Sequence, residues 1–404
     1  MYDVETIRRD FPVLSQTING KPNTFLDSAA SAQKPQAVID KIVSVYSKEY
    51  SNVHRGSYLL SEEITSEYEQ ARQKVQKFLN AKSDKEIVFT RNATESINLV
   101  ASTWGRKFLT KMDEVLISEA EHHANLVPWQ VLRDEIGFEL KIFKINDDGS
   151  YNWEEFCSLL SGRTKLLAVT GMSNVLGTVF PLKQMIEEAH RIGAKVLVDG
   201  CQYVVHQPVD VQDLDCDFLA FSGHKTYGPS GIGVLYGKAD LLDAMPPYQF
   251  GGDMVNVVTY QSTTFDVPPA RFEAGTPAIV QAIGLGTALD YMMNLGMENI
   301  KAHEDELVAY MHQRLQEIDG LTEVGTAPDK GGVFSIAIEG IHPQDLAFLL
   351  DKEGVAVRVG HHCAAPLVRR MGYESLARAS FGLYTNHADI DRFVAALKKA
   401  KTFF

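Results

Sequence analysis

A short apolar run passes directly into a polar loop at residues 218–229, which read Phe218-Leu-Ala-Phe-Ser222-Gly-His224-Lys225-Thr-Tyr-Gly-Pro229. Four consecutive apolar residues predict a strand that is covered on both faces, as strands of parallel sheets are. A lysine just past the carboxyl end of such a strand lies where open α/β sheets bind their ligands. A second run, Lys195-Val-Leu-Val198, ends in the same way at Asp199. We therefore expect the Asp199 carboxylate and the Lys225 amine to reach one crevice from neighbouring strands.

This pair of groups has a specific chemical use. An enzyme that uses pyridoxal 5′-phosphate (PLP) needs an amine to form a Schiff base and an acid to keep the pyridine nitrogen protonated. The alternative is that both residues are solvated loop residues without a function. The other motifs of the chain distinguish between these two interpretations.

Composition limits the classes of protein to be considered. The chain has 404 residues, 45% of them hydrophobic, and a net charge of −13 from 39 basic and 52 acidic residues. A large core in two domains is expected at this length. The acidic balance argues against nucleic acid or an anionic membrane as the main partner.

Neither a signal peptide nor a membrane span is predicted, because the first residues lack an apolar core and no run of eighteen apolar residues occurs. The four cysteines, which are Cys157, Cys201, Cys216 and Cys363, follow no metal-binding spacing. We expect free thiols in the cytoplasm, since disulfides belong mainly to oxidising compartments.

Strand and helix patterns alternate from about residue 86 to residue 240, which is typical of a parallel α/β sheet. Strands are predicted at 87–90, 114–118, 165–169, 195–198 and 218–221, and helices at 35–50, 62–79 and 181–192. A helical stretch over 278–318 leads to a second α/β unit, with strands near 333–338 and 355–358 and helices near 343–352 and 389–400. We predict a large domain over 21–290 and a small domain formed by 1–20 and 291–404, which carries Cys363.

Two further segments follow strand ends. Ala93 and Thr94 open a predicted helix after the strand at 87–90, and a helix N-terminus in this position can bind a phosphate as well as simply be capped. His122 and His123 follow the strand at 114–118. A metal site would need a third ligand at suitable spacing, and none is near. We therefore predict no metal and expect an imidazole stacked on a flat cofactor.

Together these motifs resemble the fold-type I PLP enzymes and, within them, the SUF-type (second group) cysteine desulfurases. The resemblance covers nearly the whole chain. It rests on motifs that occur in the family's order: Leu26-Asp27-Ser28-Ala29-Ala30, His54-Arg55-Gly56, Glu121-His122-His123-Ala124-Asn125, Ser173-Asn174, Asp199-Gly200-Cys201-Gln202, Ser222-Gly223-His224-Lys225, Phe272-Glu273-Ala274-Gly275-Thr276-Pro277 and Arg358-Val-Gly-His361-His362-Cys363-Ala364.

The resemblance implies a large domain with a mostly parallel seven-stranded sheet flanked by helices, a smaller C-terminal α/β domain, and a homodimer. It implies that Lys225 forms the Schiff base, that Asp199 pairs with the pyridine nitrogen, that Gln202 bonds the phenolic oxygen and that His122 stacks on the ring. The implied phosphate ligands are Ala93, Thr94, Ser222, His224 and, from the other subunit, Thr276. The implied substrate-binding residues are Asn174, Arg358, Arg378, His361, His54 and Arg55.

The implied reaction converts L-cysteine to L-alanine and leaves the sulfur on Cys363 as a persulfide for iron–sulfur cluster assembly. The nucleophile has to be a thiolate, and His361, His362 and Arg358 would supply positive charge or proton transfer near it. A buried, inert thiol is the alternative for Cys363. Rival functions are a selenocysteine lyase or another PLP lyase on the same scaffold and a non-catalytic scaffold that binds PLP.

Departures from the family's pattern lie beside the predicted cofactor. Cys201 and Tyr203 stand where the family mostly has small residues, and Thr226 stands where a larger apolar residue is common. We expect altered pocket shape without loss of chemistry. Gly340-Ile341-His342-Pro343 resembles the subset that works with a zinc-containing SufU-like sulfur acceptor, in which this histidine reaches the metal; the alternative is a helix-start residue before proline.

Overall fold

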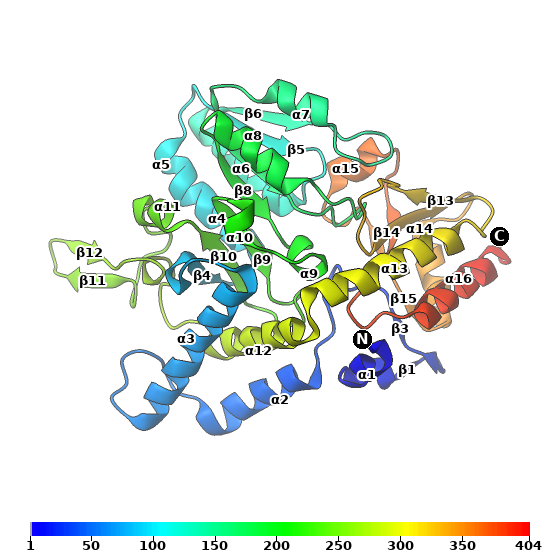
Figure 1. The fold of residues 1–404 in the computed structure, drawn as a ribbon, viewed down its shortest axis with the longest axis horizontal. Helices are drawn as coiled ribbons and strands as arrows, with labels where there is room; N and C mark the ends of the chain where they lie inside the picture. Colours follow the sequence, from blue (N-terminus) through cyan, green and yellow to red (C-terminus); the bar gives the residue numbers. More distant parts are fainter. Residues whose placement is uncertain (1) are drawn as a thin grey trace.

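Seven strands form the central sheet of the structure, a computed structural model that describes residues 2–404 (Figure 1). Their order across the sheet is β4-β10-β9-β8-β7-β5-β6. Their bounds are Ile87–Thr90 (β4), Glu114–Ser118 (β5), Glu139–Phe143 (β6), Thr164–Thr170 (β7), Lys195–Asp199 (β8), Phe218–Ser222 (β9) and Gly233–Gly237 (β10). Only β10 runs antiparallel to its neighbours, β4 and β9. The prediction of a mostly parallel seven-stranded sheet is confirmed.

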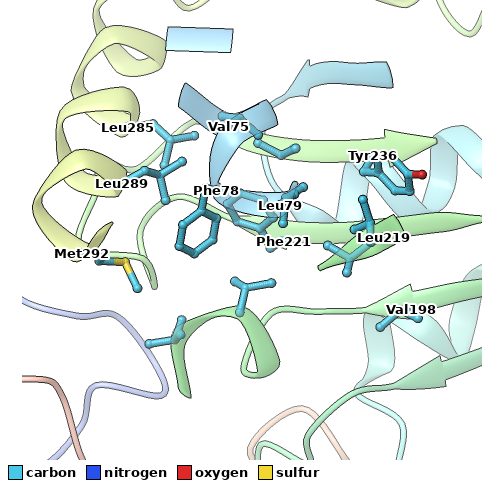
Figure 2. Close-up of a cluster of buried hydrophobic side chains, with 14 of the residues drawn as sticks. Val75, Phe78, Leu79, Val198, Leu219, Phe221, Tyr236, Leu285, Leu289 and Met292 are labelled. Atoms are coloured by element: carbon cyan, nitrogen blue, oxygen red, sulfur yellow. The ribbon is translucent and has the colours of Figure 1, made fainter. Parts of the chain in front are cut away.

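Helices cover both faces of this sheet, which is why its strands other than the edge strand β6 are buried. One face packs against α3 (Leu59–Leu79), α8 (Leu182–Arg191) and α12 (Ile279–Leu295). Figure 2 shows this layer, in which Phe78 and Leu289 lie over Phe221 of the sheet. The other face packs against α4 (Ala93–Val100), α6 (Val127–Ile136) and α11 (Ala239–Ala244). Leu219 belongs to the first layer and Phe218 to the second, so β9 is buried on both sides as its sequence predicts.

A second, antiparallel sheet of four strands occupies the C-terminal part of the chain. Its order is β13-β14-β17-β16, with bounds Leu321–Val324 (β13), Val333–Ile338 (β14), Arg358–Gly360 (β16) and Leu376–Ser380 (β17). The main helices of this part are α13 (Met297–Leu315), α14 (Pro343–Lys352), α15 (Ala365–Arg370) and α16 (His387–Lys401). A smaller α/β unit with its own apolar core is therefore present, as predicted.

The N-terminal segment packs against this smaller unit. Helix α1 (Val4–Arg9) is fixed to α16 by an ion pair of 2.6 Å between Arg8 and Asp389. Strand β3 (Thr24–Phe25) pairs in parallel with β15 (Val355–Ala356). The proposed division at residues 20 and 290 stays a prediction, and the hydrogen bonding of Thr24–Phe25 places that segment with the C-terminal part.

The remaining elements connect these units. They are α2 (Gln36–Ser44), α5 (Arg106–Phe108), α7 (Trp153–Leu159), α9 (Tyr203–His206), α10 (Val211–Leu214), β1 (Thr17–Ile18), β2 (Lys21–Pro22) and a projecting hairpin of β11 (Val255–Val258) and β12 (Thr263–Phe265). The helical stretch expected over 278–318 is confirmed, and it consists of two helices, α12 and α13, because Gly296 at φ +85° separates them. No helix within residues 2–404 is long and apolar enough to cross a membrane.

Candidate active site

The predicted crevice lies at the carboxyl ends of β8 and β9. Asp199 is the last residue of β8 and is paired in parallel register with Ala220 of β9, whose following loop carries Lys225. Both residues line one pocket of about 270 Å³. The predicted site residues that line this pocket are Ala93, Thr94, His122, Asn174, Asp199, Gln202, Ser222, His224, Lys225, Arg358, Cys363 and Arg378. Sequence positions spread over nearly 300 residues thus meet in one place.

One end of the pocket is built to bind an anion. Helix α4 begins there, capped by Asn92, whose side-chain oxygen accepts the Glu95 N–H at 2.9 Å. The Ala93 N–H donates to Ser222 Oγ at 2.9 Å, which places that hydroxyl beside the helix N-terminus. Thr94 and His224 line the same pocket. The positive end of the helix dipole favours a phosphate at this position.

Close packing of backbone against backbone supports this end of the pocket. A side chain at Gly233 of β10 would lie 2.5 Å from the Cα atom of Asn92, so only glycine allows the strand to contact the capping residue. The peptide before Lys225 is also fixed, because the His224 carbonyl accepts hydrogen bonds from the Ala32 N–H at 3.1 Å and from Lys34 Nζ at 3.0 Å. The lysine therefore extends from a rigid loop.

The imidazole of His122 is neutral. Its Nδ1 accepts the Ala124 N–H at 3.0 Å, so the ring proton lies on Nε2. Burial, and next the charge of Lys225, lower the pKa of His122 to about 4. A neutral ring can stack on a flat cofactor and can donate from Nε2.

Asp199 and Gln202 are both buried and both bonded to nearby backbone. Asp199 Oδ1 accepts the Cys201 N–H at 3.0 Å, and Gln202 Nε2 donates to the Ala29 carbonyl at 2.8 Å. Burial raises the pKa of the Cys201 thiol to about 12, so this cysteine stays protonated beside the site. A protonated thiol is a poor nucleophile, which argues against Cys201 as the sulfur carrier.

The loop that carries Cys363 is strained and tightly bonded. His362 and Cys363 have φ angles of 52° and 55°, a left-handed conformation that is uncommon for residues other than glycine. Such strain persists where the surroundings fix the backbone, and it clusters at functional sites. The Cys363 carbonyl accepts the His123 N–H at 2.7 Å, and the His362 carbonyl accepts Asn174 Nδ2 at 2.8 Å. The Cys363 side chain itself is exposed at the pocket.

Two arginines supply positive charge at the same wall of the pocket. Arg378 is buried, donates from Nη1 to the Asn174 carbonyl at 2.9 Å and contacts Asp27 at 3.4 Å. Burial lowers its pKa to about 10, which leaves it charged at neutral pH. Arg358 is half exposed and donates from Nε to Asp27 at 3.3 Å. The Nε of Arg378 is buried and has no hydrogen-bond partner within residues 2–404.

Four predicted site residues do not line this pocket. His361 lies beside His123, with ring centroids 5.7 Å apart. His54 is bonded to Glu69 at 2.9 Å, and Arg55 pairs with Asp253 at 3.4 Å. Thr276 lines a separate pocket of about 450 Å³. The roles implied for these four residues stay predictions.

Three residues that contact the site were not among the predicted site residues. His123 bonds to the Cys363 loop through both its backbone and its ring, and Asp27 contacts both arginines. Glu121 is fully buried, accepts the Thr170 N–H at 2.9 Å and accepts Asn125 Nδ2 at 2.7 Å next to His122. Burial raises the pKa of Glu121 to about 8, so it is largely neutral at pH 7. All three residues lie within the motifs quoted above, and this position is the only sequence signal that could have identified them.

The residues present fit PLP. One pocket brings together a lysine amine, a buried carboxylate, a neutral imidazole and a phosphate-binding helix N-terminus. Within residues 2–404 there is no group of three or more His, Cys, Asp or Glu residues that could bind a metal ion.

Comparison with known proteins agrees with this geometry. A family model described as aminotransferase class-V matches residues 24–393. A cysteine desulfurase of Pectobacterium atrosepticum is 50% identical over 98% of both chains, and one of Synechococcus elongatus is 48% identical over 99% of this chain, which spans 64% of that longer protein. The crystal structure of the Escherichia coli cysteine desulfurase CsdA, in its S-sulfonic acid form, has a TM-score of 0.93 and 39% identity over the full length of both chains. The chain therefore belongs to the class-V aminotransferase family and, within it, to the cysteine desulfurases.

Proposed function

We propose that this protein converts L-cysteine to L-alanine and keeps the sulfur as a persulfide on Cys363, from which it is supplied to iron–sulfur cluster assembly. The observation that carries the proposal is that the Lys225 and Asp199 pair and the exposed Cys363 thiol line one pocket. A PLP enzyme without sulfur transfer would not need an exposed cysteine there.

Lys225, Asp199, Gln202 and His122 would hold the cofactor PLP, with its phosphate at the N-terminus of α4. When bound, PLP withdraws electrons from the substrate Cα and thereby makes the substrate sulfur open to attack by a thiolate. The free Lys225 amine can then act as the general base that moves the Cα proton. The neutral His122, with its proton on Nε2, is a hydrogen-bond donor that lines the same pocket.

The guanidinium of Arg378 and the amide of Asn174 would orient the substrate carboxylate. Arg358 lies at the pocket as a second charge. A planar guanidinium can bond both carboxylate oxygens, which an ammonium cannot do as well.

Cys363 would attack the substrate sulfur as a thiolate. A sulfur–sulfur bond forms, the bond between the substrate Cβ and its sulfur breaks, and Cβ keeps the electron pair and takes up a proton to give alanine. Arg378 lies close enough to Cys363 for a charge on the sulfur to interact with the guanidinium. The exposure of Cys363 lets an acceptor protein reach the persulfide.

Two substitutions test the assignment. We expect K225A to lose the visible absorbance of covalently bound PLP, and C363A to keep that absorbance and lose persulfide formation. Mass spectrometry after exposure to L-cysteine should locate one added sulfur on Cys363, and C201A should behave as the wild-type protein. Normal sulfur transfer by C363A would refute the assigned nucleophile.

The sulfur acceptor and the assembly belong to the same proposal. We infer a SUF-type system with a SufU-like, zinc-containing acceptor, a homodimer and a cytoplasmic location. His342 is exposed at the start of α14, and its Nδ1 accepts the Gln344 N–H at 3.2 Å. This leaves Nε2 for contact with a partner's metal, which supports the acceptor assignment.

A further inference from the structure

The turn from Ser173 to Gly177 connects the two sheets of the molecule. It follows β7 of the large sheet and contacts the segment that enters β14 of the small sheet. The Val179 N–H donates to the Asp329 carbonyl at 2.9 Å, and the Gly331 N–H donates to the Gly177 carbonyl at 2.9 Å. A side chain at Gly177, which has φ +75°, would lie 2.7 Å from the Val333 carbonyl. The two backbones therefore touch directly.

Three successive carbonyls of this turn each accept a hydrogen bond from a side chain of the C-terminal part. The pairs are Asn174 O with Arg378 Nη1 at 2.9 Å, Val175 O with Ser335 Oγ at 2.7 Å, and Leu176 O with Lys330 Nζ at 2.5 Å. Arg378 lines the active-site pocket, whereas Ser335 and Lys330 do not. The side chains of these two residues therefore act on the site through the turn, while the backbone of Ser335 is also paired with Arg378 in the sheet.

The ammonium group of Lys330 is buried, and it has several partners within the protein. Its Nζ also donates to the Gly325 carbonyl at 2.8 Å, lies 3.5 Å from Glu323 and sits 4.9 Å from the centroid of the Phe334 ring. An ammonium buried in this way keeps its charge only with such partners. The position of the Leu176 carbonyl is thus fixed by a charged donor, which is stronger than a neutral one.

The opposite side of the turn carries the contacts that matter for the reaction. The Asn174 side chain lines the pocket and donates from Nδ2 to the His362 carbonyl at 2.8 Å. His362 directly precedes Cys363 in the strained loop. A shift of the turn would therefore move Asn174 and release one bond of the Cys363 loop together.

We propose that Lys330 and Ser335 are positioning residues, which fix the Ser173–Gly177 turn and thereby align Asn174 with the substrate and Cys363 with the sulfur. This inference rests on the proposed desulfurase function. Neither residue touches the reacting atoms. Their effect should appear in substrate affinity and in sulfur transfer and should leave cofactor binding unchanged, because Asp199 belongs to β8 and Lys225 to the loop after β9.

The test uses the PLP-loaded, full-length protein with L-cysteine. We expect K330M to raise KM and to slow persulfide formation on Cys363, each by about tenfold, since a charged hydrogen bond to the turn is lost. S335A should shift both quantities in the same direction by a smaller factor. K330R should keep most of the wild-type rate, because a guanidinium can donate to both carbonyls. The absorbance of bound PLP should stay as in the wild type in all three variants.

The matched control is K238M. Lys238 is also a partly buried lysine that donates to a backbone carbonyl, that of Asp215 at 2.9 Å, but it does not line the pocket. The K238M substitution should leave KM and the rate of persulfide formation unchanged. Wild-type KM and rate in S335A and in folded K330M would overturn the inference, and S335A decides alone where K330M does not fold. Absence of sulfur on Cys363 in the wild-type protein would instead refute the proposed function itself.

Discussion

His123 bonds to the Cys363 loop twice. Its N–H donates to the Cys363 carbonyl at 2.7 Å, and its ring Nε2 accepts the Ala365 N–H at 3.1 Å. Burial, and next the charge of His361, lower the pKa of His123 below its ordinary value of 6.5. The ring is therefore neutral at pH 7, which is the state that can accept a hydrogen bond at Nε2.

We expect H123A to slow persulfide formation on Cys363 by about fivefold at pH 7.5, because one hydrogen bond that fixes the loop is lost. A histidine with a lowered pKa in the folded protein contributes its neutral-state bond above pH 6.5 and loses it as the pH falls and the ring is protonated. The ratio of wild-type to H123A rates should therefore approach one at acidic pH. Single-turnover measurements between pH 5 and pH 8 check this expectation.

The control is H387A, because His387 is a partly exposed histidine at the start of α16 that pairs with Glu306 instead of the Cys363 loop. A rate ratio for H123A that stays constant with pH would contradict the assigned role of the neutral ring.

At the scale of single residues, sequence reasoning found the groups whose chemistry is visible in a short motif. Lys225, Asp199 and Cys363 are of this kind, and all three line the pocket. The roles of Asp27 and Lys330 could not be predicted from the sequence, because they depend on partners that are remote in the chain. Asp27 contacts Arg358 and Arg378, which are 331 and 351 positions away. No local sequence pattern specifies such long-range contacts.

At the scale of elements, a buried ion pair joins α3 to the loop that carries Thr276. Arg72 donates to both carboxylate oxygens of Glu273, at 2.7 and 2.9 Å, and Glu273 also accepts the Phe89 N–H of β4 at 2.7 Å. Both side chains are nearly inaccessible to water. The helix, the strand and the loop therefore depend on one carboxylate.

We expect E273A to lower the free energy of unfolding by about 3 kcal/mol, because the buried Arg72 guanidinium loses its two bonds to Glu273 and keeps only Glu69 as a carboxylate partner. Urea unfolding followed by circular dichroism measures the change. The matched control is E135A, which removes the same two-bond geometry from Arg106 at an exposed site, where both side chains are about half accessible. E135A should have a much smaller effect on the free energy of unfolding, because solvent screens an exposed ion pair. Equal effects of the two substitutions would contradict the argument from burial.

Elements with a complete apolar pattern were predictable, and elements without one were not. The buried strands β4, β5, β7, β8 and β9 were all expected from sequence. Strand β6 lies at the sheet edge and is partly exposed, so its pattern was missed. The hairpin of β11 and β12 is almost wholly exposed and was missed as well. Edge position and exposure remove the periodic signal on which such predictions depend.

At the scale of the whole molecule, this hairpin projects away from the body of the chain (Figure 1). It nevertheless carries large apolar side chains, with Val257, Val258 and Tyr260 exposed by 53%, 62% and 105%. A hairpin with so few other contacts is marginal in water. Apolar side chains gathered on an exposed element are typical of an interaction surface. The predicted homodimer would give them a partner and would bring Thr276 toward a second active site.

We expect the wild-type protein to sediment as a dimer of the 44.9 kDa chain, and the double substitution V258D/Y260D to shift it toward the monomer, because two buried apolar contacts would become charged. Sedimentation velocity over a range of protein concentrations measures the shift. F348D is the matched control, since Phe348 is also an exposed apolar residue, 60% accessible, but lies on α14 of the C-terminal part. It should remain dimeric. If both variants stayed dimeric, the hairpin would be excluded as the contact, and a monomeric wild-type protein would remove the basis for assigning Thr276 to the partner's phosphate site.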